Sequence, residues 1–418
     1  MALVFYNIFL LLYKGGIRLS SVWNNKAKLW VNGRKNIFDR LSKALETHNS
    51  EIIWFHCSSL GEFEQGRPVI EKIKSQFPGS KILLTFFSPS GFEIRKDYQE
   101  ADWVFYLPLD SGKNARQFLD IVRPSLVVFV KYDYWYYYLT ECRRRKISLL
   151  MISSIFRKEQ AFFKWYGSLH RKMLQCFSYI FVQDNESLQL LESINIKTAN
   201  IAGDTRFDRV SEIAENFKPI SEIATFCGRS QVLVAGSTWP ADEKLIKDAA
   251  SILTDLKTII APHEINNGHL QELKSLFPGA IFFSELKTFD SESISERYLI
   301  IDNIGMLSRL YHYATITYVG GGFNKGIHNT LEAAVYGKPV LFGPNYEKFR
   351  EAIGLIASGG GICVNSTTEF NSQLKKILNT RSELTLRSQQ SLEFVKENRG
   401  ATQKILSYIQ ENRLLTNW

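Results

Sequence analysis

Short apolar runs alternate along the chain with longer stretches in which apolar residues recur every three or four positions. This alternation predicts βαβ units, and therefore parallel sheets that are covered by helices on both faces. A first series of expected strands spans residues 52–55, 82–86, 103–106, 126–130, 148–152 and 179–182. A second series spans residues 232–235, 258–261, 280–283, 298–301, 316–319, 340–342 and 361–364. The predicted fold class is therefore α/β with two Rossmann-like domains.

A more polar stretch over residues 208–231, which includes Pro219, separates the two series. A chain of 418 residues is also too long for one ordinary hydrophobic core. We therefore expect an N-terminal membrane-associated segment over residues 1–40, a first domain over 41–210 and a second domain over 211–418. The second domain would carry a helical tail over residues 382–410, which we expect to pack back across to the first domain.

The net charge of +9 is concentrated at one end, because residues 1–40 hold seven Lys or Arg and one Asp. Such an end charge suits an anionic membrane surface better than a nucleic-acid groove, for which a basic stripe within a folded domain is typical. We therefore expect a membrane surface and no nucleic acid as partner. A merely solvated basic face is the alternative.

Residues 1–13 are almost wholly apolar and are followed by Lys14 and Arg18. A bilayer crossing needs about 20 apolar residues, and no small-residue cleavage site follows this run. The pattern favours an uncleaved anchor, interfacial or partly inserted, with its basic residues on the cytoplasmic side of the membrane.

The five cysteines are far apart and form no C-x-x-C pair, which indicates a reducing compartment. Neither a disulfide framework nor a cysteine zinc site is predicted, and most of the thiols are expected to be packing groups. No carboxylate pair or histidine cluster has the spacing of metal ligands, so we expect no metal and no cofactor.

The stretch 317–332 passes from an apolar run into three consecutive glycines and then into a helical pattern that ends at Gly337. Glycines 320–322 would allow a tight turn and the close approach of a ligand. Free N–H groups, together with the positive end of the helix dipole, would favour a phosphate there. This stretch therefore predicts an anion site.

Acidic residues at predicted helix starts allow two interpretations. Asn329 and Glu332 match a capping box, in which Asn329 caps the helix and Glu332 returns a hydrogen bond to the cap N–H. In the functional interpretation, Glu332 accepts hydrogen bonds from a nucleotide ribose. Asp242 and Glu243, at another predicted helix start, are expected only to complement the helix dipole.

Six separated segments together resemble the Kdo transferases, which move 3-deoxy-D-manno-octulosonic acid (Kdo) from CMP-Kdo to a lipid A precursor. They are His56-Cys-Ser-Ser-Leu-Gly-Glu62, Ser88-Pro-Ser-Gly91, Tyr106-Leu-Pro-Leu-Asp110, Gly203-Asp-Thr-Arg-Phe-Asp208, Gly236-Ser-Thr-Trp-Pro-Ala-Asp-Glu243 and the stretch from Val319 to Pro344. The resemblance implies a glycosyltransferase B fold, in which two Rossmann-like domains face each other across a cleft. It also implies action on lipid IVA in lipopolysaccharide core biosynthesis, at the cytoplasmic face of the bacterial inner membrane.

The resemblance assigns the catalytic base to Glu62, the last residue of Ser59-Leu-Gly-Glu62. Transfer requires the acceptor hydroxyl to lose its proton as it attacks the anomeric carbon, and a positioned carboxylate can accept that proton. A helix N-terminus beside Glu62 would favour the ionised carboxylate. The alternatives are that Glu62 only stabilises this helix start, or that Glu64 is the base.

The resemblance assigns the CMP-sugar to the second domain. The expected contacts are Ser237, Thr238, His263, Gly305, Met306, Gly321, Gly322, Asn329 and Glu332. Ser237 and Thr238 would give hydroxyl and backbone donors to the phosphate. Three positions depart from the family: Trp239 replaces a histidine, His263 lacks the preceding arginine, and Met306 replaces a glutamate. The last change permits only a backbone contact at Met306.

The acceptor is assigned to the first domain. The expected contacts are Ser59, Gly61, Ser88, Gly91, Lys131 and Asp133. Lys131 and Asp133 replace two glutamates of the family. Lysine pairs with phosphate and aromatic faces stack on sugars, so the segment 131–138 is expected to meet lipid phosphate and sugar rings. Aromatic packing at a strand end is the alternative.

Two other functions remain open from the sequence. Another two-domain glycosyltransferase that uses a UDP-sugar would need the same glycine loop and the same Glu332. A non-catalytic, membrane-associated protein that binds a nucleotide or lipid would have no need of Glu62.

Overall fold

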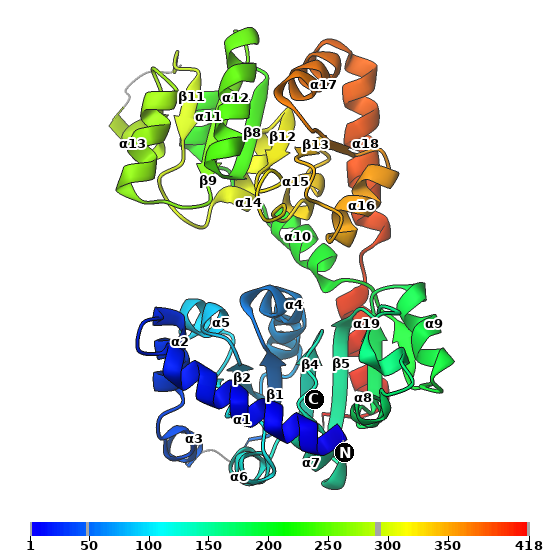
Figure 1. Cartoon of the computed structure of the whole chain (residues 1–418). Coiled ribbons are helices and arrows are strands. Elements are labelled where there is room, and N and C mark those ends of the chain that lie inside the picture. Colours follow the sequence, from blue (N-terminus) through cyan, green and yellow to red (C-terminus); the bar gives the residue numbers. More distant parts are fainter. Residues whose placement is uncertain (1, 47–49, 289–293, 416–418) are drawn as a thin grey trace. The chain divides into compact units, whose positions relative to one another are not determined.

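The computed structural model describes residues 2–46, 50–288 and 294–415 (Figure 1). The chain divides into two compact units. The first comprises Met1–Asp208 and Gly400–Trp418, and the second comprises Arg209–Arg399. Each unit is built around a seven-stranded sheet in which the strands pair in parallel.

The first sheet has the order β3-β2-β1-β4-β5-β6-β7. Its strands are β1 Ile52–Cys57, β2 Lys81–Phe86, β3 Trp103–Tyr106, β4 Leu126–Val130, β5 Ser148–Ser154, β6 Tyr179–Val182 and β7 Ala199–Ile201. Its helices are α1 Ala2–Ser20, α2 Asn25–Gly33, α3 Ile37–Leu45, α4 Leu60–Gln76, α5 Pro89–Arg95, α6 Gly112–Val122, α7 Tyr136–Arg144, η1 Ala161–Phe163, α8 Ser168–Leu174, α9 Asn185–Ser193 and α19 Ala401–Glu411. The six expected strands are present, and β7 is too short and too exposed to be predicted from an apolar run.

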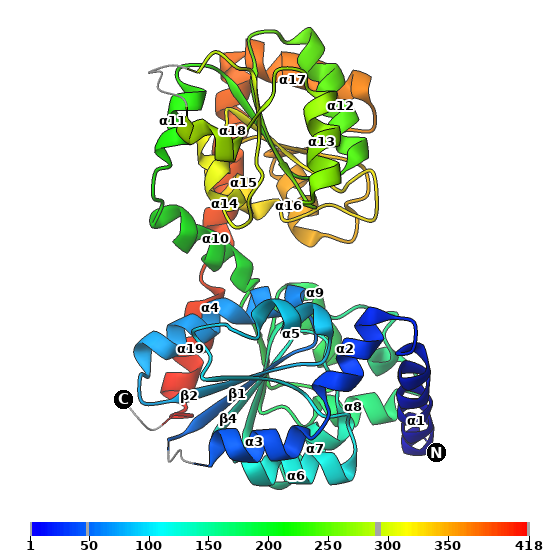
Figure 2. The same cartoon turned by 90° about the vertical axis from the view of Figure 1, so that its left-hand side faces the viewer.

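Both faces of this sheet are covered, as the continuous apolar runs predict. Trp54 of β1 packs with Phe118 in a core under α3, α6 and α7, whereas its neighbour Phe55 packs with Ile70 in a core under α4 and α19 (Figure 2). Successive strand side chains point to opposite faces, so β1 contributes to both cores. This double burial holds the ends of β1 and of its neighbours in place.

The C-terminal helix α19 belongs to the first unit. Ile405 of α19 is fully buried in the core beside α4. Asp208 accepts hydrogen bonds from the N–H groups of Gly400, at 2.6 Å, and of Thr402, at 2.7 Å, and so caps this helix. The prediction of one domain over residues 211–418 is therefore wrong for the last segment, because the apolar face of α19 is buried in the other unit.

The second sheet has the order β10-β11-β9-β8-β12-β13-β14. Its strands are β8 Val232–Thr238, β9 Lys257–Pro262, β10 Ile281–Phe282, β11 Tyr298–Ile300, β12 Ile316–Val319, β13 Val340–Phe342 and β14 Gly361–Cys363. The helices are α11 Ser221–Cys227, α12 Pro240–Ile252, α13 Asn267–Leu276, η2 Phe283–Thr288, α14 Leu307–Leu310, η3 Tyr311–Tyr313, α15 Leu331–Ala334, α16 Arg350–Ala357, α17 Thr367–Asn379 and α18 Arg381–Glu397. α10 Thr205–Glu215 contains the boundary between the units.

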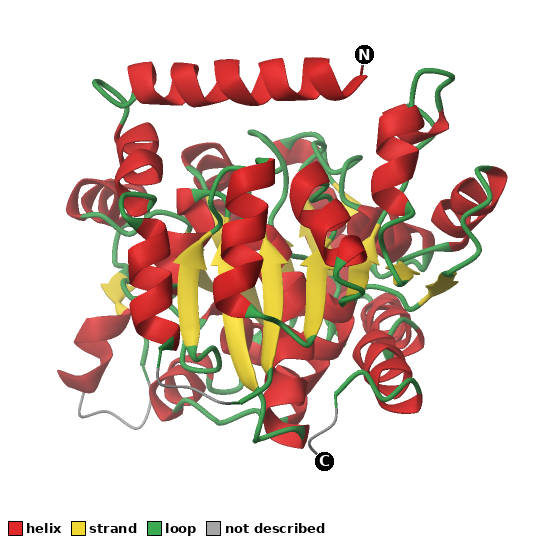
Figure 3. Ribbon diagram, turned by 90° about the horizontal axis from the view of Figure 1, so that it is seen from below, coloured by secondary structure: helices red, strands yellow, loops and turns green. Residues whose placement is uncertain are grey.

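The N-terminal helix α1 runs along the outside of the first unit (Figure 3). The Tyr6 hydroxyl donates a hydrogen bond to Asp110 Oδ2 at 2.6 Å, and the Tyr13 ring stacks on Phe87 with 5.9 Å between ring centroids. α1 is longer than the apolar run 1–13. By length and composition alone it could cross a membrane, but signal sequences near an N-terminus meet the same criteria.

Candidate active site

Glu62 lies in the first turn of α4, directly after β1. Its Oε2 accepts hydrogen bonds from the Ser59 N–H at 2.9 Å and from the Ser59 hydroxyl at 3.3 Å. The helix-capping role is therefore present. Burial and then the nearby Asp133 carboxylate raise the pKa of Glu62 to about 8, although Ser59 and the charge of Lys131 act in the opposite direction. A carboxyl group with this pKa is mostly protonated at neutral pH and becomes a base as the pH rises through about 8.

A buried histidine network lies beside this helix start. His56, at the end of β1, has its Nδ1 2.8 Å from Thr85 Oγ1 and its Nε2 3.0 Å from Asp133 Oδ2. The Trp135 indole N–H also points to His56 Nε2, at 3.1 Å, and the Ser58 hydroxyl donates to Asp133 Oδ1. These contacts hold the loop after β4 against the loop after β1. The Ser58 hydrogen bond positions Asp133, the carboxylate that adds to the effect of burial on the pKa of Glu62.

Sequence reasoning did not single out His56, Thr85 or Trp135. A histidine inside an otherwise apolar strand was the available signal, because a buried imidazole needs polar partners. His56 and Thr85 are fully buried. We assign to these three residues the positioning of the loop 131–135.

Lys131 stands at the end of β4 with φ +68°, a left-handed conformation that turns the chain sharply after the strand. Its Nζ lies 5.1 Å from the centroid of the Tyr132 ring. Lys131 and Asp133 exert opposite electrostatic effects on Glu62: the Asp133 charge raises its pKa and the Lys131 charge lowers it.

The other expected acceptor contacts are mainly structural. Ser88 caps α5 by accepting the Ser90 N–H at 3.2 Å, and the Ser88 N–H donates to Ser58 O at 2.8 Å. A Cβ on Gly91 would lie 2.3 Å from the Phe86 ring, so close packing requires glycine there. Gly61 is exposed, and a Cβ on it would meet nothing within 4 Å. The structure therefore gives no packing reason for glycine at position 61.

In the second unit, Asp242 holds the glycine loop. Its carboxylate accepts hydrogen bonds from Trp239 N–H at 2.9 Å, from Gly321 N–H at 2.9 Å and from the Tyr318 hydroxyl at 2.6 Å. Gly320 N–H donates to Gly236 O at 2.9 Å. The expectation of free N–H groups is therefore wrong at Gly320 and Gly321, because a buried carboxylate and a neighbouring strand take them.

The glycines are still required, for packing. Gly321 has φ +92°, and a Cβ on Gly322 would lie 2.5 Å from Gly343 Cα. The helix that follows is also shorter than predicted, since α15 is a single turn over Leu331–Ala334. Such a short helix has a weak dipole, so the anion preference cannot come from α15 alone.

The two hydroxyl residues after β8 differ. Thr238 is fully buried, and its hydroxyl donates to Glu243 Oε1 at 3.0 Å. Its expected role as a hydroxyl donor to a phosphate is therefore wrong for this arrangement. Ser237 is partly exposed with φ +52°. Within the described parts of the chain its hydroxyl has no assigned partner, so it is available to a ligand, whereas the Thr238 hydroxyl is not.

Three aromatic rings stack beside Ser237. Trp239 and His263 lie with 4.8 Å between ring centroids, and His263 and His328 with 4.3 Å. The Trp239 indole N–H donates to His328 Nε2 at 3.1 Å. Burial and then the neighbouring His263 lower the pKa of His328 to about 4, so His328 is neutral at physiological pH. Trp239 thus orients His263 and His328. No role for His328 was predicted from the sequence.

Asn329 and Glu332 are joined through their side chains, with Asn329 Nδ2 donating to Glu332 Oε1 at 3.1 Å. Asn329 Oδ1 also accepts the Leu331 N–H at 3.2 Å. Thr330, and not Asn329, is the residue that precedes α15. The bond between the two residues therefore differs from the reciprocal capping box, which would use the cap N–H.

Gly305 and Met306 precede α14. Gly305 has φ +96°, and the Met306 side chain is 4% exposed while its carbonyl accepts the Arg309 N–H at 3.0 Å. A buried thioether cannot reach a polar ligand, so only backbone contacts are available at Met306. Across residues 2–46, 50–288 and 294–415, no group of three or more His, Cys, Asp or Glu could hold a metal ion.

Comparisons with known proteins agree over most of the chain. A family model described as 3-deoxy-D-manno-octulosonic-acid transferase (kdotransferase) matches residues 35–209. The 3-deoxy-D-manno-octulosonic acid transferase of Rickettsia felis is 26% identical over 86% of this chain and 78% of that protein. The protein of the same name from Aquifex aeolicus is 27% identical over 79% of this chain and 87% of its own length.

Solved structures show the same fold at low sequence identity. The glycosyltransferase from Rickettsia africae has a TM-score of 0.57 at 15% identity, and the match covers 89% of this chain and 100% of that one. The UDP-GlcNAc 2-epimerase from Neisseria meningitidis has a TM-score of 0.60 at 16% identity, covering 86% and 100%. These similarities establish the class of two Rossmann-like units and nothing about the substrate.

Proposed function

We propose that this chain, a member of the Kdo transferase family of glycosyltransferases, transfers Kdo from CMP-Kdo to a lipid A precursor such as lipid IVA. The observation that carries the proposal is Glu62, whose carboxyl pKa is raised to about 8 at the start of α4. A non-catalytic protein would need Glu62 only as the helix cap that Ser59 and Glu62 form.

Glu62 would accept the proton of the acceptor hydroxyl as that oxygen attacks the anomeric carbon of Kdo. The new carbon–oxygen bond forms while the bond to the phosphate of CMP breaks, and CMP leaves as the monophosphate. Asp133, held by the Ser58 hydroxyl, adds to the effect of burial in raising the pKa of Glu62, which makes the ionised carboxylate a stronger base. Lys131 would pair with a phosphate of the acceptor.

The second unit would bind the CMP moiety. Ser237 would donate its hydroxyl to the phosphate, and His263, exposed between Trp239 and His328, would present its ring edge to the same ligand. Glu332, oriented by Asn329, would accept hydrogen bonds from the ribose hydroxyls. Gly305, Met306, Gly321 and Gly322 would contribute only backbone atoms and close packing.

The place of action that we propose is the cytoplasmic face of the bacterial inner membrane. The exposed apolar side chains of α1 and the basic residues that follow support this placement. The first unit would hold the acceptor, because Glu62 and α1 both belong to it.

The test is incubation of the purified protein with CMP-Kdo and tetraacylated lipid A precursor, followed by mass spectrometry for added octulosonic units. We expect addition of Kdo, and thermal protection of the protein by CMP but not by UDP. Protection by UDP alone would identify a UDP-sugar transferase. Binding of CMP without any transfer would favour the non-catalytic alternative.

A further inference from the structure

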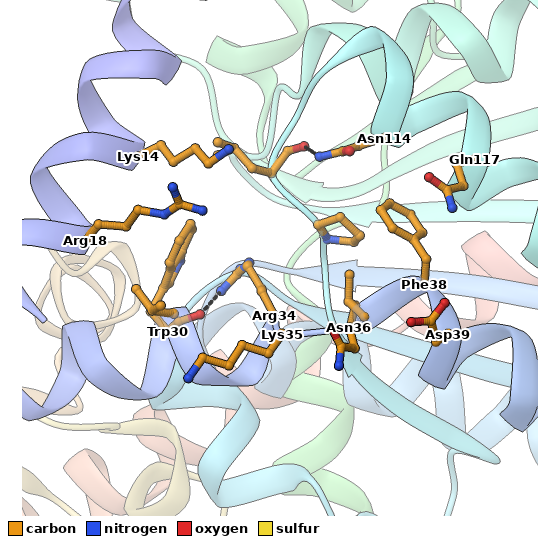
Figure 4. A pocket seen from close by; sticks show the side chains of 14 residues that line it. Lys14, Arg18, Trp30, Arg34, Lys35, Asn36, Phe38, Asp39, Asn114 and Gln117 are labelled. Atoms are coloured by element: carbon orange, nitrogen blue, oxygen red, sulfur yellow. Dashed lines mark hydrogen bonds between the residues drawn. The ribbon is translucent and has the colours of Figure 1, made fainter.

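The first unit contains a cavity of about 460 Å³ between α1 and the segment that joins α2 to α3 (Figure 4). Its walls also include Pro108, Leu109, Asn114 and Gln117. Neither Glu62 nor any other residue of the proposed acceptor site lines it. The cavity is therefore a feature that the proposed transfer does not use.

Four cations line this cavity, and a single carboxylate, Asp39, accompanies them. Lys14 and Arg18 extend from α1 along one side of it, and Lys35 lies on the other side of Trp30 (Figure 4). Among the residues that the structure describes, no ion pair is assigned to these three exposed side chains. Three like charges around one cavity, none with an assigned ion pair among the described residues, favour an anionic ligand.

Arg34 forms a fixed base for the cavity. Its guanidinium donates to the carbonyl oxygens of Leu107 at 2.8 Å, Trp30 at 3.1 Å and Phe87 at 2.7 Å. The guanidinium carbon also lies 3.9 Å from the centroid of the Trp30 ring. Neutral carbonyl groups satisfy its hydrogen bonds but do not cancel its charge, so Arg34 adds to the positive potential of the cavity.

The cavity borders an apolar surface. Exposed apolar side chains continue along α1 and the turn after it: Val4, Phe5, Ile8, Phe9, Leu11, Leu12, Leu19, Val22 and Trp23. The opposite side of α1 is held to the unit by Tyr6 and Tyr13. A helix with one side docked and the other apolar suits the plane of a membrane interface better than a crossing of the bilayer.

We propose that this cavity binds the phosphate group of an anionic phospholipid in the leaflet on which α1 lies. Apolar side chains of α1 would enter the acyl region, which would leave Lys14 and Arg18 at the depth of the headgroups. Lysine and arginine both pair with phosphate, and Lys35 and Arg34 would complete the cluster. The inference rests on the proposed membrane association, and it is independent of the transfer at Glu62.

Co-sedimentation of the full chain with lipid vesicles tests the proposal. One set of vesicles contains phosphatidylglycerol, and a second set has the same surface charge from a carboxylate lipid without phosphate. The cavity variant is Lys14→Gln/Arg18→Gln/Lys35→Gln. The matched control, Lys26→Gln/Lys28→Gln/Lys43→Gln, removes the same charge from exposed positions of α2 and α3 that do not line the cavity.

We expect the wild type to prefer phosphatidylglycerol vesicles, and the cavity variant to bind them about tenfold more weakly than the control does. Both variants lose three positive charges, so the non-specific attraction of the protein to anionic vesicles falls equally in both. The difference in their binding therefore measures the contribution of the cavity. Equal binding by the two variants, or no preference of the wild type for phosphate lipid, would overturn the proposal. A difference that arises only when lipid A precursor is added to the vesicles would assign the phosphate to the acceptor and overturn it too.

Lys35→Gln alone, compared with Lys28→Gln, repeats the test if the triple variant fails to fold. Transfer to acceptor dispersed in detergent is measured separately on the wild type. Its failure would contradict the proposed function and leave the vesicle result intact, so the two failures can be told apart.

Discussion

The two units share one local arrangement, an acidic residue that caps the helix after a central strand, but this residue has different neighbours in each unit. In both, a central strand ends in a short loop, and the third residue of the next helix is acidic and accepts the N–H of the cap residue. In the first unit the pair is Ser59 and Glu62, and in the second it is Trp239 and Asp242. Each pair lies where the strand order reverses, between β1 and β4 or between β8 and β12, which is the usual ligand position in such sheets.

The neighbours of the two carboxylates differ. Asp242 is 1% exposed and accepts two further hydrogen bonds, from Gly321 N–H and the Tyr318 hydroxyl. Among the described residues, Ser59 is the assigned donor to Glu62. Burial first, and then the Asp133 carboxylate, raise the pKa of Glu62 to about 8. Burial also raises the pKa of Asp242, but its three donors act in the opposite direction. Asp242, which accepts three hydrogen bonds, serves to hold the glycine loop. Glu62, which has a second carboxylate beside it, is the better candidate for proton transfer. Both helices have an acidic third residue after a central strand, so the local sequence does not distinguish Glu62 from Asp242. Their neighbours from distant parts of the chain do.

The variant Glu62→Gln is the most direct test of whether Glu62, unlike Asp242, takes part in transfer. Because glutamine cannot accept the proton, we expect transfer to fall by about 10²–10⁴-fold, with the affinity for CMP nearly unchanged. The control is Glu64→Gln, since Glu64 is paired with Arg95 at 2.8 Å and should be dispensable. Mass spectrometry of the lipid product measures both. Loss of transfer in the Glu64 variant, with retention in the Glu62 variant, would move the base to Glu64.

The variants Glu332→Ala and Asn329→Ala test whether Glu332, which Asn329 orients, binds the nucleotide in the second unit. We expect each to weaken CMP binding about tenfold in calorimetric titration, equivalent to about 1.4 kcal/mol. The exposed Glu347→Ala is the matched control. If these residues only cap α15, the variants would instead lose about 0.5–2 kcal/mol of stability and bind CMP as the wild type does.

Asp242→Asn tests the structural half of the comparison. An asparagine amide cannot accept all three donors, so we expect a loss of about 1–3 kcal/mol in the unfolding free energy of the second unit. Thermal unfolding should show a lower Tm for this variant and a nearly unchanged Tm for Glu62→Gln. Equal losses in the two variants would show that both acids serve the fold alone.

The smallest expected effect is on pH dependence. Glu62 must be ionised to act, so kcat/KM should rise with pH through about 8. Asp133→Asn removes a charge that raises this pKa, and should move the rise to lower pH. Lys131→Gln removes a charge that lowers it, and should move the rise to higher pH. If both variants shifted the pH profile in the same direction, or if neither shifted it, ionisation of Glu62 would not be the cause of the pH dependence.

Local sequence patterns were enough to predict both series of strands, the glycine loop and the acidic residue at each helix start. These features depend on local rules: continuous apolar runs for strands buried on both faces, glycine for close packing, and acids at helix N-termini. The six quoted segments also led to the family that the comparisons support. The N-terminal apolar run predicted α1, although not its full length.

Only the tertiary structure decided which groups remain available for a ligand. Gly321 lies 79 positions from Asp242, which takes its N–H, and Trp135 lies 79 positions from His56, to which it donates. The apolar face of α19 could be assigned to the first unit only once a core existed to receive it. Hydrogen bonds and burial between residues far apart in the chain leave no local signature, because either partner alone is compatible with many neighbours.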